Sequence, residues 1–154
     1  MVIYSNGNLF MEPAQCYVNA VNCVGTMGKG IALEFKKRYP DYFNYYIMLC
    51  REGYLRKAGD AKVYTNSLGF PLYIISAATK MHYTDKSTLE DIKTLLTRIE
   101  YLIAVFEMKS IAIPALGCGL GGLKWSEVHP LMEKQFGDLK CEVTLYLPRN
   151  HGSF

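Results

Sequence analysis

The stretch VNAVNCVGTMGKGIA, residues Val18–Ala32, decides how the rest of the chain is interpreted. It predicts a strand, then a flexible loop, then the start of a helix. Glycines allow the backbone to approach a ligand closely, and the unpaired N–H groups at a helix start favour a phosphate. An ordinary strand-to-helix turn needs one glycine, whereas this stretch has three glycines beside two asparagines. We therefore interpret it as a ligand-binding loop.

On both sides of this stretch, short apolar runs rich in β-branched and aromatic residues alternate with helical patterns, which is typical of an α/β domain. The longest helix is expected from about Thr88 to Met108, because apolar residues recur there at the spacing of one helical stripe. The expected strands are Val2–Tyr4, Tyr17–Val21, Lys62–Tyr64, Leu72–Ala77, Ser110–Ile113 and Glu142–Leu147.

Local signals also predict where the helices begin and end. Ser87 and Glu90 have the spacing of a capping box at the start of the long helix. A helix that begins in the glycines of the first loop is expected to stop at Pro40. Another helix is expected after Ser126, with Pro130 tolerated because it falls in the first turn.

A second glycine-rich loop, PALGCGLGGLKW at Pro114–Trp125, also follows an expected buried strand and precedes a helix. It contains G-x-G-x-x-G at Gly117, Gly119 and Gly122. In a dinucleotide-binding domain this motif opens the first β-α-β unit, whereas here it lies near the end of the sequence, which disfavours a nicotinamide-dependent dehydrogenase. Neither loop has the G-K-[ST] ending of a P-loop, so an NTPase is also disfavoured. Two such loops instead predict backbone jaws that hold a nucleotide diphosphate from both sides without a metal.

One lysine follows directly after an apolar strand, in the segment IISAATKMH at Ile74–His82. Lys80 is therefore expected at the rim where ligands of open α/β sheets bind. Partial desolvation there lowers the pKa of an ammonium group and makes the amine a nucleophile toward an electrophilic sugar carbon. On position alone, a solvated lysine at a strand exit is the more ordinary interpretation. His82 is likewise more often a surface or packing residue than a proton-transfer partner.

Two further features leave a functional and a structural interpretation open. Cys118, in a glycine loop near a helix start, has the setting of a thiolate nucleophile, but no base is identifiable and a packing role is favoured. Lys36–Tyr39 and the aromatic residues after it combine cations with rings, as in a surface that stacks single-stranded bases. A pair of amphipathic helices that buries these rings explains the pattern at least as well.

The composition indicates one soluble domain, residues 1–154, with half of the residues hydrophobic and a fifth charged. A net charge of +3 is mild for a protein that grips DNA through many phosphates. Five scattered cysteines without a C-x-x-C pair favour neither a disulfide framework nor a zinc site, and they indicate a reducing compartment. Without a signal peptide or an apolar run long enough to cross a bilayer, we expect a cytoplasmic monomer that needs no membrane, metal or cofactor.

From Tyr4–Phe10 to the last expected strand, the chain resembles a macrodomain, the α/β/α fold that binds ADP-ribose. Met27–Ala32, Thr79–Lys80 and Gly117–Leu120 with Trp125 are together similar to the branch that holds terminal ADP-ribose glycohydrolases and the DarG antitoxins. DarG enzymes remove ADP-ribose from thymidine in DNA after the toxin DarT has attached it. The resemblance implies a three-layer α/β/α macrodomain with a mixed central sheet.

The resemblance also implies a role for each matching residue. Asn8, Leu9 and Tyr146 would lie near the adenine, and Asn22 would orient the hydroxyls of the distal ribose. Lys80 matches the catalytic lysine of this branch, which ranks it above a solvated strand-exit residue. The jaws would be formed by Gly25, Thr26, Met27, Gly28, Lys29, Gly30 and Ile31 on one side and by Ala115, Leu116, Gly117, Cys118, Gly119, Leu120 and Gly121 on the other.

Two positions depart from patterns found elsewhere in the family. Many macrodomains carry aspartate where Asn8 stands; asparagine accepts the same hydrogen bond from an adenine amino group but adds no charge. The protein-directed glycohydrolases of the branch place a catalytic aspartate where this chain has Gly121, so its absence matches the DarG pattern.

The resemblance thus implies an ADP-ribosyl glycohydrolase that releases ADP-ribose from a nucleobase in DNA, with ADP-ribosylated DNA as substrate and a DarT-type toxin as partner. The alternatives are a hydrolase acting on ADP-ribosylated protein carboxylates or on ADP-ribose 1″-phosphate, a non-catalytic reader of ADP-ribose, and a nucleotide-dependent oxidoreductase.

Overall fold

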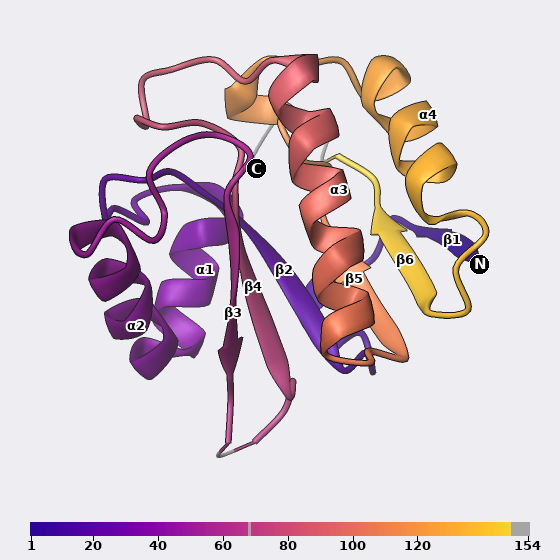
Figure 1. Ribbon diagram of the computed structural model, residues 1–154, viewed down its shortest axis with the longest axis horizontal. Helices are drawn as coiled ribbons and strands as arrows, with labels where there is room; N and C mark the ends of the chain where they lie inside the picture. The colour runs from indigo at the N-terminus through magenta and orange to yellow at the C-terminus, as the bar shows by residue number, and fades with distance from the viewer. Residues whose placement is uncertain (68, 149–154) are drawn as a thin grey trace.

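The computed structural model describes residues 1–67 and 69–148, and in them a six-stranded sheet is covered by helices on both faces (Figure 1). The end of the expected domain, residues 149–154, lies outside the described residues. The strands are β1 (Val2–Ser5), β2 (Cys16–Val21), β3 (Ala61–Thr65), β4 (Tyr73–Ala78), β5 (Ser110–Ile113) and β6 (Glu142–Tyr146). The helices are α1 (Gly30–Arg38), α2 (Pro40–Arg51), α3 (Leu89–Val105) and α4 (Trp125–Phe136), with 3₁₀ turns η1 (Leu9–Met11) and η2 (Gly119–Gly121).

The sheet has the strand order β1-β6-β5-β2-β4-β3. β3 runs antiparallel to β4, whereas the other neighbouring pairs among the described strands are parallel. The mixed central sheet that the sequence predicts is therefore confirmed. After β2 the chain builds β3 and β4 on one side, and after β4 it returns to place β5 on the other side of β2. The carboxyl ends of β2, β4 and β5 thus meet at a reversal of strand order, where open α/β sheets bind their ligands.

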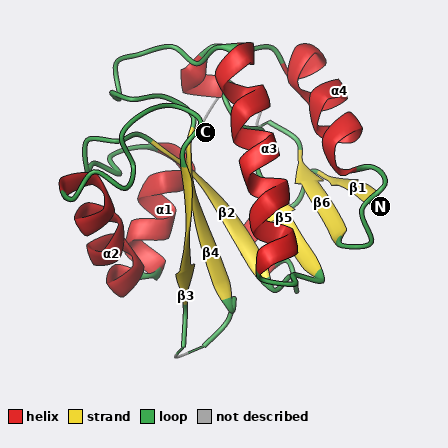
Figure 2. Cartoon of the chain, viewed as in Figure 1, coloured by secondary structure: helices red, strands yellow, loops and turns green. Residues whose placement is uncertain are grey.

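The central strands are buried on both faces, which gives the domain two apolar cores. On β2, Cys16 and Val18 pack into a cluster with side chains of α3 and α4, whereas Tyr17 and Val21 pack into a cluster with side chains of α1 and α2. Successive strand side chains point to opposite faces, so each face receives alternate residues. The helices on the two sides of the sheet complete the three layers (Figure 2).

The start of α3 differs from the prediction by one residue. The helix is capped by Thr88, whose side chain accepts a hydrogen bond from the Asp91 backbone N–H at 3.2 Å. The capping box predicted at Ser87 and Glu90 is therefore wrong. Ser87 is buried instead, and its hydroxyl donates to the Thr79 carbonyl at 2.9 Å. A hydroxyl that the local pattern assigns to a helix cap is used in a tertiary contact.

The prolines affect the other helices in two ways. Pro40 separates α1 from α2 and is the first residue of α2, where its missing N–H costs no helical bond. This helix pair buries aromatic side chains of both helices, which supports the packing interpretation of the Lys36–Tyr39 region. α4 begins at Trp125 rather than after Ser126, so Pro130 lies inside the helix and not in its first turn as predicted. Pro130 removes one backbone hydrogen bond from that helix.

Candidate active site

A cavity of about 700 Å³ opens where β2, β4 and β5 end, a size typical of small-molecule sites at roughly 300–1,000 Å³. Both glycine loops and the lysine at the end of β4 contribute to its wall. The predicted site residues that line it are Asn22, Thr26, Met27, Gly28, Lys29, Ile31, Lys80, Ala115, Gly117, Cys118, Leu120 and Gly121. Three segments that are far apart in the sequence therefore meet at one cavity.

The first glycine loop is held in place by the side chain of Asn22. Its Nδ2 donates to the Thr26 carbonyl at 3.0 Å and to the Thr26 hydroxyl at 2.9 Å. Its Oδ1 accepts from the Val24 backbone N–H at 3.0 Å and from the Tyr46 hydroxyl at 2.7 Å. Both ends of the amide are thus bonded within the protein. Tyr46, which lies on α2, anchors the loop from the helical layer beneath it.

The end of the first loop leads directly into α1. Among the described residues, no side chain caps this helix: its N-cap is Lys29, and Ile31 and Ala32 in the first turn line the cavity. A Cβ atom at Gly28 would meet nothing within 4 Å, so the backbone is open to the cavity there. The first N–H groups of a helix have no partner within the helix, and its dipole favours an anion at that end. This side of the cavity is thus suited to a phosphate.

The second glycine loop is closely packed against its neighbours. Gly117 has a φ of +78°, and a Cβ atom there would approach Leu123 to 2.8 Å and Ile92 to 3.0 Å. At Gly121, a Cβ atom would approach the Ser87 Oγ to 2.6 Å. The Ser87 backbone N–H also donates to the Gly121 carbonyl at 3.0 Å. This contact leaves no room for a carboxylate side chain at position 121 while Ser87 keeps its place.

Lys80 extends from the end of β4 into the cavity wall, as its position in the sequence predicts. Partial burial lowers the pKa of its ammonium group below the ordinary value, and the positive charge of Lys86 lowers it further. The carboxylate of Asp85 acts in the opposite direction. A larger fraction of Lys80 is therefore a neutral amine at a given pH than for a solvated lysine, which is the form that attacks an electrophilic carbon.

The other two candidates for chemistry have structural roles. Burial raises the pKa of the Cys118 thiol to about 11, so this cysteine is kept as the thiol and not as the nucleophilic thiolate. His82 is fixed by its neighbour Thr84, whose hydroxyl lies 2.8 Å from the histidine Nδ1 and whose backbone N–H donates to the same atom at 3.2 Å. Within the described residues, no group of three or more His, Cys, Asp or Glu side chains is placed to hold a metal ion.

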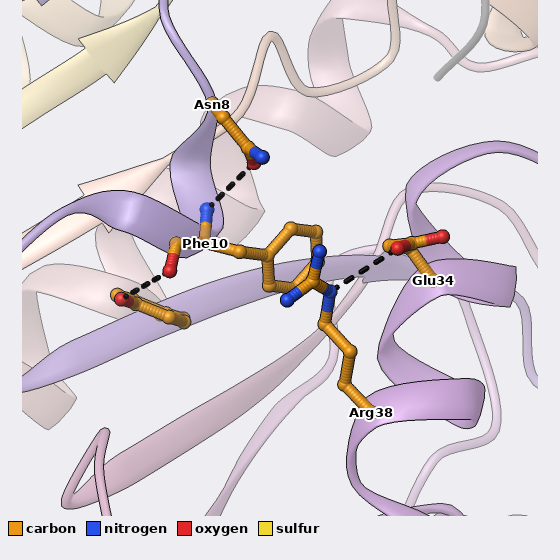
Figure 3. Close-up of polar contacts among 5 residues, drawn as sticks. Asn8, Phe10, Glu34 and Arg38 are labelled. Carbon is orange, nitrogen blue, oxygen red and sulfur yellow. Dashed lines mark hydrogen bonds and ion pairs between the residues drawn. The ribbon is translucent and has the colours of Figure 1, made fainter.

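Asn8 lies at the start of η1, outside the cavity wall. Its Oδ1 accepts a hydrogen bond from the Phe10 backbone N–H at 3.0 Å (Figure 3). The guanidinium of Arg38 lies over the Phe10 ring, 4.5 Å from its centroid, and Arg38 also pairs with Glu34 at 3.1 Å. The oxygen that the sequence assigns to an adenine amino group is therefore used to cap η1.

Other predicted ligand-binding residues also lie outside the cavity wall as far as the chain is described: Leu9, Gly25, Gly30, Leu116, Gly119 and Tyr146. Leu9, Leu116 and Tyr146 are buried among core side chains. The Tyr146 hydroxyl donates to the Glu12 carboxylate at 2.7 Å. Gly25, Gly30 and Gly119 have positive φ values and shape the turns that carry their neighbours to the cavity.

Sequence reasoning missed one side of the cavity. The connection from β4 to α3, residues 79–88, contributes Thr79, Tyr83, Thr84, Asp85 and Lys86 to the wall. It carries no glycine motif and no apolar periodicity, so the only available signal was its proximity in sequence to Lys80. The wall also includes Ala20, Val21 and Ala32, which belong to the predicted ligand-binding stretch Val18–Ala32 but were not singled out within it.

Within residues 1–67 and 69–148, none of the helices is long and apolar enough to cross a bilayer.

Known proteins have sequences related to this chain. The DNA ADP-ribosyl glycohydrolase of Mycobacterium tuberculosis is 37% identical over 153 residues, which are 99% of this chain and 44% of that protein. The chain thus spans less than half the length of that curated relative.

Solved structures match the fold over almost all of the chain. The macrodomain of Thermus aquaticus DarG has a TM-score of 0.90 and 37% identity, covering 96% of this chain and 99% of that one. Thermosipho africanus DarTG in complex with ADP-ribose also has a TM-score of 0.90, with 33% identity, covering 96% of this chain and 41% of that one. A family model for the Macro domain matches residues 18–132. Together with the two glycine loops around one cavity, this match shows that the chain belongs to the macrodomain family.

Proposed function

We propose that the cavity binds ADP-ribose and that the protein removes ADP-ribose from a nucleobase in DNA. The observation that carries this proposal is Lys80, an amine with a lowered pKa that lines the same cavity as two glycine loops. The names of the relatives support it, since one is a DNA ADP-ribosyl glycohydrolase and one is a DarTG protein in complex with ADP-ribose.

In this proposal the diphosphate lies between the loops. The free N–H groups at the start of α1 and the open backbone at Gly28 would contact it from one side, and the backbone from Gly117 to Gly121 would contact it from the other. Asn8 and Leu9, at the start of η1, and Tyr146, at the end of β6, would border the adenine, although Leu9 and Tyr146 are buried before a ligand binds. Asn22 would reach the distal ribose by exchanging one of its hydrogen bonds to Thr26 for a ribose hydroxyl.

The reaction centres on the anomeric carbon of the distal ribose. The neutral amine of Lys80 would form a C–N bond to this carbon, or stabilise the opened sugar, while the bond to the base breaks; the base leaves with the bonding electron pair and takes up the proton that the lysine nitrogen releases. Water would then attack the same carbon, release ADP-ribose and restore the lysine. Fixing the diphosphate and the ribose supplies the positioning part of catalysis, and Lys80 supplies the covalent or acid-base part.

The position of Gly121 argues against a protein-directed enzyme. A second carboxylate there would require Ser87 to move, because even a Cβ atom would lie 2.6 Å from its hydroxyl. A site that has the lysine but no second catalytic carboxylate matches an enzyme acting on a modified nucleobase better than one acting on a modified protein. A transferase that attaches ADP-ribose to DNA must supply such a substrate. We propose a DarT-type toxin in that role, because one relative is a fusion of a DNA ADP-ribosyl transferase with a DNA ADP-ribosyl glycohydrolase.

The test is incubation with a thymidine-linked ADP-ribosyl oligonucleotide, an ADP-ribosylated protein and ADP-ribose 1″-phosphate in parallel. We expect release of ADP-ribose from the oligonucleotide, and a loss of roughly 100-fold or more in rate with Lys80→Ala, the usual scale for removing a catalytic proton-transfer group. Calorimetry should find that this variant still binds free ADP-ribose. If modified DNA is untouched while another substrate is hydrolysed, the DNA proposal is wrong. If none of the three substrates is hydrolysed while the wild type and Lys80→Ala bind free ADP-ribose equally well, the protein is a reader.

A further inference from the structure

The connection from β4 to α3, residues 79–88, has an exposed aromatic side chain beside the catalytic candidate. In Figure 1 this connection arches over the upper edge of the sheet to the start of α3. Tyr83 lines the cavity and yet remains 54% exposed, so its side chain lies at the rim rather than in the interior. Met81, the residue after Lys80, is 51% exposed. The proposed reaction does not use either side chain.

Hydrogen bonds within the connection hold it in a defined shape. The Asp85 carboxylate accepts from the His82 backbone N–H at 3.0 Å, and the Asp85 N–H donates to the His82 carbonyl at 3.0 Å. The connection is also attached at both ends: the Met81 carbonyl accepts from the Cys23 N–H at 2.8 Å, and the Ser87 N–H donates to Gly121. Tyr83 therefore lies on a turn whose backbone is held in place by hydrogen bonds.

The Tyr83 ring also has a neighbouring ring. The imidazole of His82 lies with its centroid 4.1 Å from that of Tyr83, at an interplanar angle of 31°. The imidazole is itself fixed through its Nδ1 contact with Thr84. A tyrosine supported in this way loses little conformational freedom when a flat partner stacks on it.

We propose that Tyr83 is a stacking platform for a nucleotide of the modified DNA strand next to the ADP-ribosylated base. This inference rests on the proposed function, in which the base is attached to the sugar carbon that Lys80 attacks. In this inference the group joined to that carbon leaves the cavity past the residues that follow Lys80, and the first ring there that lines the cavity is on Tyr83. Lys86, on the same connection, adds a cation within reach of a backbone phosphate.

Single-stranded DNA fits this surface better than a protein chain does. Every base has a flat aromatic face, so an exposed ring beside a cation binds a strand with little dependence on sequence. Stacking of one base on an aromatic side chain changes affinity roughly 5- to 150-fold when the ring is removed.

The experiment compares two substrates that share the reacting bond. One is an ADP-ribosyl thymidine oligonucleotide and the other is the ADP-ribosyl thymidine nucleoside, which has no neighbouring nucleotide. We expect Tyr83→Ala to lower kcat/KM for the oligonucleotide at least fivefold more than for the nucleoside. Tyr83→Phe, which keeps the ring, should retain the preference of the wild type for the oligonucleotide.

Tyr101→Ala is the matched control, because Tyr101 is an equally exposed tyrosine at 55%, located twelve residues along α3 from its start. It should leave both substrates unaffected. Equal effects of Tyr83→Ala on both substrates, or a loss with Tyr83→Phe as large as with alanine, would overturn the stacking role and leave the proposed function standing. If the wild type hydrolyses neither substrate, the proposed function itself fails, and this inference fails with it.

Discussion

Gly121 offers a quantitative test of how the cavity is built. Its substitution by alanine would place a Cβ atom 2.6 Å from the Ser87 Oγ and 3.2 Å from the Ser87 Cβ. Ser87 is 6% exposed, so its side chain has to rotate or shift, and either movement breaks its 2.9 Å hydrogen bond to the Thr79 carbonyl. Overpacking costs about 1–3 kcal/mol, and a buried carbonyl left without its donor about 1–3 kcal/mol. We expect Gly121→Ala to lower the free energy of unfolding by about 2–6 kcal/mol, measured by urea denaturation.

A double-mutant cycle identifies the cause of that loss. Ser87→Ala removes the oxygen that clashes, so Gly121→Ala should cost less in the Ser87→Ala background than in the wild type. The expected coupling is about 1–2 kcal/mol, within the range for residues in direct contact. Turnover should fall together with stability in Gly121→Ala, because the Thr79 carbonyl adjoins Lys80. Additive losses, within about 0.5 kcal/mol, would show that the Ser87 contact is not what requires glycine at this position.

Two further predictions concern the lysine and the first loop. The rate should rise with pH through the lowered pKa of Lys80, since the neutral amine is the reacting form; Lys86→Met removes a positive charge and should shift this rise to higher pH. Asp85→Asn removes a negative charge and should shift the rise in rate to lower pH. If the pH profiles of kcat of the two variants shift in the same direction, or do not shift, Lys80 is not the group that titrates. Tyr46→Phe deletes the hydroxyl that donates to Asn22 Oδ1 at 2.7 Å and should cost about 1–3 kcal/mol in urea unfolding. It should also weaken ADP-ribose binding in calorimetry, and unchanged affinity would mean that the anchor does not shape the loop.

The sheet was predictable because its signals are local. β2 and β4 are mostly apolar and are buried on both faces, and such runs between helical patterns indicate central strands. The choice between Ser87 and Thr88 as the cap of α3 was not local. Both residues have a hydroxyl and an acidic residue three positions later, and the contact of Ser87 with the end of β4 decides which of them is free to cap the helix.

In the candidate site, too, some residues were predictable from local sequence and others depend on tertiary contacts. The glycines identify loops that can approach a ligand, because a residue without a side chain leaves the backbone accessible, and this is visible in the sequence itself. The adenine end could not be placed in this way, because Leu9 and Tyr146 look the same in the sequence whether their side chains face a ligand or the core. The sequence also did not predict that the residues from Tyr83 to Lys86 line the cavity. Their position depends on hydrogen bonds from Met81 and Ser87 to segments more than thirty residues away in sequence.

The hydrogen bonds divide the site into two parts that respond differently to substitution. Tyr46 and Asn22 brace the first loop from α2, on the face of the sheet covered by α1 and α2. Ser87 bonds the end of β4 and also the second loop, so it joins Lys80 to the opposite jaw. Substitutions at Tyr46 should therefore appear mainly as weaker binding of ADP-ribose. Substitutions at Ser87 should lower kcat as well, because Ser87 fixes both the backbone before Lys80 and the second loop, which is proposed to hold the diphosphate. In the proposed reaction this junction is needed for catalysis, because the Lys80 amine has to stay at a fixed distance from the sugar of a ligand held between the two loops.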